Sequence, residues 1–423
     1  MKSELLCVVV AVAVVACTPR IARPCRADDQ CEDDQRCDGG DDDTIGTCVD
    51  VDDPFEGEGE PGEGEGEGEG EREPVAAVVV ETGVTFSCAI DADRHVQCWG
   101  GNGSGQLGRV TDFGRDDEPA AIANLEEVSD LAVGSSSACA LGRRDGGLPD
   151  VWCWGNAADM GGIDAAVDFD VGVLVQPRAL RGGFGRTVVD LDADGDNNGS
   201  VICATNDEGV VRCFGAQIEG SGDGFPEEQP LLTDLVQPAT LLVTLEGICG
   251  LSSSATTAAC VKVARGMGLI GCGVDGPCAT LNGGEPFSVE GDNTCRVDDG
   301  DLVCAGDNTF GVADPAEREA LSVAEHTLRS GASDVGVGEQ HACAILLGDV
   351  WCWGRPLNGA TGIFEDDLDT APCSAELPES VRCHGLRVVQ PPSSMGAASF
   401  SGLSVHRQRT CALATDGRVM CFG

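Results

Sequence analysis

The chain has 423 residues, with 72 Asp or Glu against 26 Lys or Arg, so its formal net charge at pH 7 is -46. Nucleic acids and anionic lipid headgroups are bound mainly through basic residues. A chain this acidic is therefore not expected to bind nucleic acid. It also has 24 Cys without a single C-x-x-C pair, and only 12 Phe, 5 Trp and no Tyr. These cysteines indicate disulfides formed in an oxidising compartment rather than a zinc ribbon or a thioredoxin-like redox site.

An export signal is predicted over residues 1–16. Its apolar run from Leu5 to Ala16 is too short to span a bilayer as a helix, which takes about 20 residues, so we expect the signal to be removed. The sequence V-V-A-C ending at Cys17 resembles a bacterial lipobox. The resemblance implies acylation of Cys17 and, because Thr18 is not Asp, a lipid anchor in the outer membrane or at the cell surface. An ordinary signal peptide cleaved at the same place is the alternative.

A cysteine-rich segment, residues 17–50, and an acidic linker, residues 51–73, come next. Cys25, Cys31, Cys37 and Cys48 predict a small disulfide knot with three possible pairings, of which Cys25–Cys37 with Cys31–Cys48 would cross-link the segment best. We interpret the acidic residues between them as a solvated loop rather than a calcium site. Residues 56–73 are nearly pure Glu-Gly with nine Glu, which predicts an extended, flexible tether.

Seven copies of one unit follow in residues 74–423. The first copy is FSCAIDADRHVQCWGGNGSGQLG, residues 86–108, and the last is RTCALATDGRVMCFG, residues 409–423. The first cysteines of the copies are separated by 51, 64, 46, 46, 48 and 68 residues. A period near 50 with short β runs and Gly-rich turns predicts a β-propeller with one blade of four strands per repeat.

Each unit has the pattern of a β-hairpin. Asp299-Gly300 is a two-residue turn signal, and counting outward from it brings Cys295 opposite Cys304. We therefore expect a cross-strand disulfide in every blade, and two further pairs in local loops. The blade pairs are Cys88–Cys98, Cys139–Cys153, Cys203–Cys213, Cys249–Cys260, Cys295–Cys304, Cys343–Cys352 and Cys411–Cys421; the loop pairs are Cys272–Cys278 and Cys373–Cys383. In the fourth repeat, Cys272-Gly273 offers a competing register to Cys260.

The phrase C-A-L, D-G, V-x-C-W-G, N-x-x-G-Q-L-G resembles the regulator of chromosome condensation repeat family, in the cysteine-paired version found on secreted bacterial lipoproteins. The resemblance is specific around Cys98-Trp99-Gly100 and decays elsewhere, where Phe214, Phe422 and Ala305 replace Trp. It implies an all-β, seven-bladed propeller. It also implies that residues 73–77, which resemble the strand following the repeat turn, complete the seventh blade and close the ring.

No catalytic constellation is expected. The five histidines, His95, His326, His341, His384 and His406, have no metal-binding spacing, and no nucleophile elbow or P-loop occurs. Asp190, Asp192, Asp194 and Asp196 alternate as in the start of a calcium loop, but Val201 stands where a bidentate Glu is needed. This is a weak calcium candidate, and we favour an ordinary loop between strands. We expect no enzyme activity and no cofactor.

Three functions are compatible with these observations. The first is a lipid-tethered binding module that holds a protein or a surface polymer through its propeller loops. The second is regulation of another enzyme, guanine-nucleotide exchange or β-lactamase inhibition, as the resemblance implies. The third is a structural spacer of the envelope. The long inserts after Gly155, Gly215 and Gly354 are the best contact candidates, with Phe225, Phe364 and Leu357 as apolar anchors.

Overall fold

The structure is a computed structural model of residues 1–423. In the N-terminal part it describes the main chain of residues 5–10, 14–19, 24–25, 35–38 and 46–50. Further along it describes residues 76–111, 114–144, 150–156, 173–179, 188–196, 199–215, 227–228, 238–244, 247–252, 257–262, 281–282, 286–317, 320–362, 370–374, 377–378, 380–391, 395 and 398–423. The chain divides into two compact units, residues 1–72 with 390–398 and residues 73–389 with 399–423.

The N-terminal unit contains five short strands. β1 (Leu5–Val10) pairs with β2 (Val14–Pro19), and β5 (Gly46–Asp50) lies between β3 (Pro24–Cys25) and β4 (Gln35–Asp38). The main chain sets Cys37 opposite Cys48. The tether and residues 73–75 lie outside the described residues. The export signal, the acylation of Cys17 and the pairing of the four knot cysteines stay predictions.

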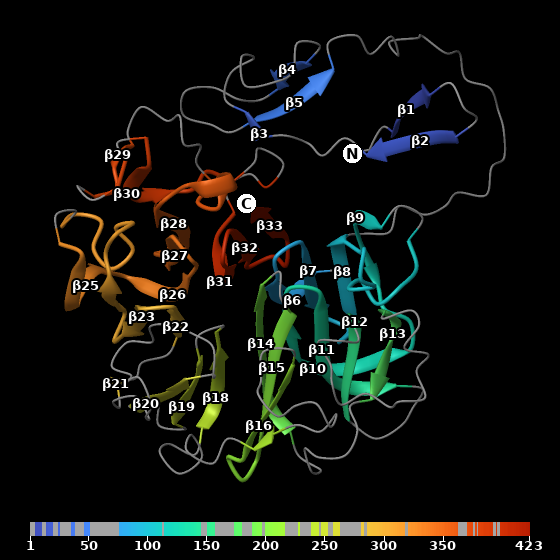
Figure 1. Ribbon diagram of the computed structural model, residues 1–423, viewed down its shortest axis with the longest axis horizontal. Coiled ribbons are helices and arrows are strands. Elements are labelled where there is room, and N and C mark those ends of the chain that lie inside the picture. The colour runs from blue at the N-terminus through green and yellow to red at the C-terminus, as the bar shows by residue number, and fades with distance from the viewer. Residues whose placement is uncertain are drawn as a thin grey trace. The chain divides into compact units, whose positions relative to one another are not determined.

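The second unit is a ring of antiparallel sheets. Its described strands form seven sheets that follow one another in chain order, and the first strand of each lies nearest the axis (Figure 1). From the axis outward the first four sheets are β6 (Ala77–Thr82), β7 (Phe86–Asp91), β8 (Val96–Gly101), β9 (Arg115–Ala121); β10 (Leu125–Val133), β11 (Ser137–Arg144), β12 (Asp150–Asn156), β13 (Val173–Ala179); β14 (Val188–Asp196), β15 (Gly199–Asn206), β16 (Val211–Gly215), β17 (Glu227–Glu228); and β18 (Pro238–Val243), β19 (Gly247–Ser252), β20 (Thr257–Lys262), β21 (Leu281–Asn282).

The other three sheets complete the ring. They are β22 (Phe287–Glu290), β23 (Asn293–Asp298), β24 (Asp301–Asp307), β25 (Ser322–Ser330); β26 (Ala332–Val337), β27 (His341–Leu346), β28 (Asp349–Gly354), β30 (Arg382–Val388), β29 (Ala371–Pro372); and β31 (Phe400–His406), β32 (Arg409–Ala414), β33 (Val419–Phe422). A short 3-10 turn, η4, covers Leu357–Gly359. None of the helical segments that the structure describes has the length and apolar character of a membrane-spanning helix.

The hairpin of each blade is cross-linked at its centre. The structure joins the seven blade pairs expected from the repeat, from Cys88–Cys98 to Cys411–Cys421, and it joins Cys249 to Cys260 in the fourth repeat. Their Cα atoms are 4.0 to 4.2 Å apart, the spacing of non-hydrogen-bonded pairs rather than of the wider hydrogen-bonded ones. Cys373–Cys383 is joined as well, whereas Cys272 and Cys278 lie outside the described part.

The Gly that follows each C-W pair allows two main chains to approach closely. Gly100 and Gly354 have φ values of +110° and +100°, and a Cβ there would lie 2.7 Å from Thr85 O and 2.6 Å from Gln340 O. Glycine adopts this conformation without steric cost. The pairing of β8 with β9 and of β28 with β30 shifts at the same point, so the C-W-G motif places a bulge where the outer strand joins.

Apolar side chains fill the spaces between neighbouring sheets. Phe86, Leu107 and Trp154 are fully buried in one cluster that joins the first two blades, and Trp353 has the same place between the fifth and sixth. The indole Nε1 of Trp154 donates to Gln106 O at 2.9 Å, a carbonyl of the preceding blade's loop. Trp154 and Trp353, at the same position of the repeat, thus anchor the second and the sixth blade to the blade before each.

Closure of the ring differs from the expected strand exchange. The seventh sheet has three described strands, and Ala77 starts the inner strand of the first sheet instead of pairing with β33. The prediction for Ala77 was therefore wrong. Its N–H donates to Gly417 O at 2.9 Å, in the β32–β33 turn. β6 pairs with β7 in the first sheet. The last and first blades therefore contact each other through β31, β32 and β6 without sharing a sheet.

Removing one hairpin cross-link should destabilise the propeller. For Cys343→Ala with Cys352→Ala we expect a loss of about 2.5 to 3 kcal/mol in the free energy of unfolding, from the loop-closure entropy of about ten residues. Urea unfolding monitored by circular dichroism measures it. The loop pair Cys373–Cys383, replaced in the same way, is the comparison within the same blade. A loss below about 1 kcal/mol for the hairpin pair would show that the β pairing holds this register without the disulfide.

Candidate functional site

The axis of the propeller is lined by side chains of the seven inner strands. In each blade one inner-strand residue lies opposite the first cysteine, for example Glu81 opposite Cys88 and Asp192 opposite Cys203. Because side chains alternate along a strand, residues two positions apart share a side. Asp190 and Asp192 therefore face the same way, toward the next blade.

Carboxylates at these positions bond to the main chain of the neighbouring blade. Oδ2 of Asp130 accepts from Leu191 N at 2.6 Å, and Oδ2 of Asp334 accepts from Leu403 N at 2.7 Å. In the third blade, Oδ2 of Asp190 accepts from Leu241 N at 2.5 Å and Oδ2 of Asp192 accepts from Val243 N at 2.6 Å. Each bond ties one inner strand to the next around the axis.

Serine hydroxyls take the same role in two other blades. Ser288 Oγ accepts from Val337 N at 3.0 Å, and Ser404 Oγ accepts from Thr82 N at 2.9 Å. The Ser404 hydroxyl also donates to Glu81 Oε2 at 3.0 Å. The last blade is thus joined to the first by a relay from an amide through a hydroxyl to a carboxylate.

The axial carboxyl groups hold their protons more tightly than exposed ones. Burial raises the pKa of Glu81 to about 8. The hydrogen bond from Ser404 opposes this shift, and repulsion from Asp130 and other axial acids adds to it. Burial also raises the pKa of Asp130 and of Asp334 to about 6. For Asp190, burial and the charge of Asp130 raise the pKa to about 7, and burial raises the pKa of Asp192 well above its ordinary value.

One pair crosses the axis. His406 Nε2 in the seventh blade lies 2.6 Å from Asp194 Oδ1 in the third, and both side chains are buried. The corresponding inner-strand positions of the two intervening blades are Gly83 and Gly134. A Cβ at Gly83 would lie 2.1 Å from Gly134 O and one at Gly134 would lie 2.5 Å from Ser200 Oγ, so the lack of a side chain allows neighbouring blades to approach closely here.

The alternating aspartates thus belong to a strand and not to a loop. Asp190 to Asp196 lie in β14, paired with β15, so the expectation of an ordinary loop there was wrong. The carboxylates of Asp190 and Asp192 accept main-chain hydrogen bonds, and Asp194 faces His406. Within the described residues no group of three or more His, Cys, Asp or Glu could hold a metal ion; the Asp196 side chain lies outside the described part.

Three of the histidines lie within hydrogen-bond distance of a threonine or an aspartate. His341 Nε2 lies 3.0 Å from Thr410 Oγ1, and burial together with the charge of His384 lowers the pKa of His341 to about 3. His384 Nε2 lies 2.9 Å from Thr361 Oγ1, and His326 Nε2 lies 2.9 Å from Asp314 Oδ2. These contacts join β27 to β32 and outer strands to loops.

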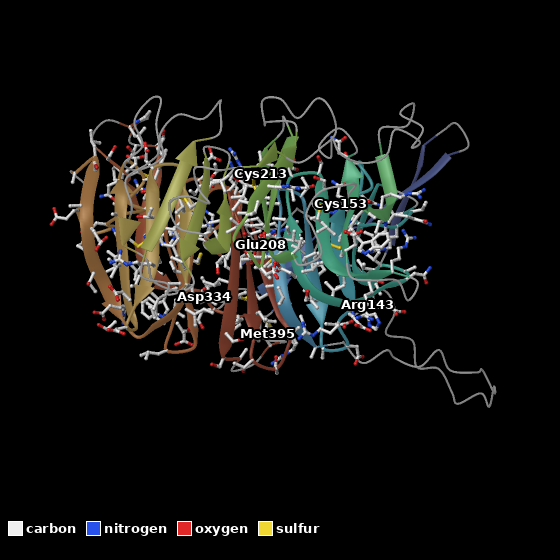
Figure 2. All side chains as sticks on the ribbon, turned by 90° about the horizontal axis from the view of Figure 1, so that it is seen from below. Arg143, Cys153, Glu208, Cys213, Asp334 and Met395 are labelled. Atoms are coloured by element: carbon white, nitrogen blue, oxygen red, sulfur yellow. A yellow bond between two sulfur atoms is a disulfide. The ribbon has the colours of Figure 1, made fainter. Side chains whose placement is uncertain are left out.

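The strands that precede the three inserts, β12, β16 and β28, end at a single face of the ring, because all blades share one strand order. We call this face the insert face. Cys153 and Cys213 lie toward this face, and Arg143, near the opposite end of the β11–β12 hairpin, lies toward the other (Figure 2). Of the expected anchors, Leu357 lies half-buried in η4, while Phe225 and Phe364 are outside the described residues.

Sequence reasoning missed most of the axial groups. Glu81, Asp130 and Asp334 were not singled out, and His406 was considered only as a metal ligand. Asp130 and Asp334 each stand nine positions before the first cysteine of their repeat, within S-D-L-A-V and S-D-V-G-V. An acid recurring at one position of an apolar strand was the available signal, because a charge in a buried strand requires a partner.

Seven sheets around an axis, built from one repeated hairpin, define the second unit as a β-propeller of sequence repeats. Residues 77–106 match the family model described as the regulator of chromosome condensation (RCC1) repeat. Prp20p from Saccharomyces cerevisiae is similar in structure, with 15% identity, a TM-score of 0.59 and coverage of 80% of this chain and 82% of that chain. Human WBSCR16 has 14% identity and a TM-score of 0.58, covering 81% and 88%.

These likenesses confirm the expected propeller fold, and at such identities they show the fold alone. No curated protein matches the chain in sequence. The eight disulfides of the described residues indicate an oxidising, extracytoplasmic location.

The raised pKa values predict a dependence of stability on pH. The folded chain keeps axial protons that the unfolded chain releases near pH 4, so their contribution to stability is full below that pH and is lost as the pH rises through about 6 to 8. Asp190→Asn removes one titrating group and keeps an oxygen for Leu241 N–H. Its unfolding free energy should fall less steeply between pH 5 and pH 7 than that of the wild type, by at most about 1.4 kcal/mol per pH unit.

Urea unfolding at several pH values measures this slope. Asp416→Asn is the matched control, because Asp416 is exposed and hydrogen bonds from Arg418 lower its pKa, which places its titration below this window. An Asp190→Asn slope equal to that of the wild type would contradict the assignment of a raised pKa to this group.

Proposed function

We propose that the chain is an exported, non-enzymatic binding protein that holds a protein or a surface polymer through the insert face of its propeller. The observation that carries the proposal is that β12, β16 and β28, which directly precede the inserts after Gly155, Gly215 and Gly354, all end at this face. Loops displayed together on a rigid scaffold are a recurrent arrangement of binding sites.

The chemistry of the described residues supports binding more than catalysis. The axial acids are engaged in bonds between blades, His341 and His384 are bonded to threonines, and His406 faces Asp194. Groups committed to structural bonds are poorly placed to exchange protons with a substrate at the insert face. Regulation of another enzyme and a role as an envelope spacer are the alternatives, and no described contact favours either.

The N-terminal sequence supports attachment of this binding protein to a membrane by lipid. We propose that Cys17 is acylated and that the Glu-Gly tether of residues 56–73 holds the propeller away from the lipid surface of the outer membrane. Eighteen residues span at most about 60 Å when fully extended, and repulsion between nine glutamates favours extension. The disulfide-rich propeller fits this oxidising location.

Trimming the inserts tests the binding face. The full chain, immobilised and exposed to cell-envelope extract, should capture a partner that a variant with all three inserts replaced by short Gly-Ser links does not capture. A control variant shortens the β11–β12 turn, residues 145–149, to Asp-Gly, a change on the opposite face. Mass spectrometry compares the captured proteins and polymers. Identical capture by the trimmed variant and the wild type would eliminate the insert face.

A further inference from the structure

The seam between the last and first blades lacks a contact that other seams have. Trp154 and Trp353 are fully buried, and each donates its indole N–H to a loop carbonyl of the preceding blade, Gln106 O at 2.9 Å and Val312 O at 2.8 Å. Trp99 has the same position in the first blade, between Cys98 and Gly100. It is only partly buried, and its indole N–H has no acceptor within the described part of the chain.

Arg409 faces the same seam. It begins β32, and Cys411, two residues further along, contacts Ser87 Oγ of the first blade at 3.5 Å. Side chains two apart on a strand share a side, so Arg409 also points toward the first blade. Trp99 packs against the cluster that contains Cys411, which places the indole and the guanidinium along one side of β32.

The charge of Arg409 is uncompensated within the described residues. Its Nε is buried and has no hydrogen-bond partner there. Burial, then the charge of Arg115, lowers the pKa of Arg409, while Asp117 opposes this shift. Asp117 is already occupied, since Arg115 Nε lies 2.9 Å from its Oδ2 and NH2 lies 2.9 Å from its Oδ1. A buried polar group without a hydrogen-bond partner is costly, and this one belongs to a half-buried arginine in a chain with net charge -46.

We propose that Arg409 and Trp99 form a binding site for a carboxylate group in the seam between the last and first blades. A guanidinium and an indole N–H on the same side of β32 supply two hydrogen-bond donors, and a single positive charge suits a singly charged, planar carboxylate better than a doubly charged phosphate. Arg115 adds no net charge because Asp117 neutralises it. The proposal uses no residue of the three inserts, so its test is independent of the test of the insert face.

Two sources could supply the carboxylate, an acidic residue of a partner or one of the nine Glu of residues 56–73. The probe is the peptide acetyl-Gly-Glu-Gly-amide, titrated into the full chain by calorimetry, with the Gln peptide as the neutral control. Arg409→Gln should weaken binding about tenfold to a hundredfold, the effect of a charge-assisted hydrogen bond, and Trp99→Phe about threefold to tenfold. Arg418→Gln, which removes the same charge from the β32–β33 turn, should leave the affinity unchanged.

The tether is tested with a full chain in which the nine Glu of residues 56–73 are replaced by Gln. Tighter binding of the probe by this chain would show that the protein's own carboxylates compete for the site; unchanged binding assigns the site to a partner. Arg409→Gln should melt at the same temperature as the wild type or higher, because it removes an unpaired charge. The proposal is overturned if Arg409→Gln binds the probe as the wild type does, or if neither the wild type nor the Glu-to-Gln chain binds it.

Discussion

The cross-strand disulfide at the centre of each hairpin is the constraint on which the rest of the propeller depends. Sulfur atoms can join across a sheet where facing Cα atoms lie close, as they do in non-hydrogen-bonded pairs, and the Cα separations of 4.0 to 4.2 Å fit such pairs. In such a pair the N–H and C=O of each cysteine point away from the partner strand. Linking two residues therefore also directs main-chain groups toward the inner and outer strands that complete the blade.

The same register determines what the axis can hold. Once the first cysteine is paired, the inner-strand residue opposite it and the residue two positions earlier both face the next blade. A short side chain with an acceptor oxygen at either position reaches an N–H group of that blade. Asp192 and Ser404 occupy the first of these positions, and Asp130 and Asp334 the second. Acidic side chains that would be costly in an apolar core gain hydrogen bonds between blades, at the cost of raised pKa values where they crowd the axis.

The hairpin of each blade could be predicted almost completely from the sequence, whereas most contacts at the axis could not. Asp299-Gly300 and Cys295 with Cys304 determine a turn, its length and a facing pair, because these are local properties with a two-residue period. The partner of Asp190 lies 51 residues away and is a backbone N–H, which no residue type marks. The pair of His406 with Asp194 joins the seventh blade to the third, which are not neighbours in the ring. Contacts that depend on the number of blades and their order cannot be inferred from a local pattern.

The place expected for Ala77 at the ring's closure was wrong for a related reason. Each blade is alike in sequence, so a pattern assigns Ala77 to a strand without saying which sheet that strand joins. In the structure β6 pairs with β7, and Val79 to Thr82 face the successive residues from Ile90 to Ser87. The last blade then meets the first through Ser404, Thr82 and Glu81. The seam between the last and the first blade is the one place in the ring where the chain does not run from one blade into the next. There the indole N–H of Trp99 and the Nε of Arg409 have no hydrogen-bond partner among the described residues, so a carboxylate bound at this seam would displace no hydrogen bond of either group.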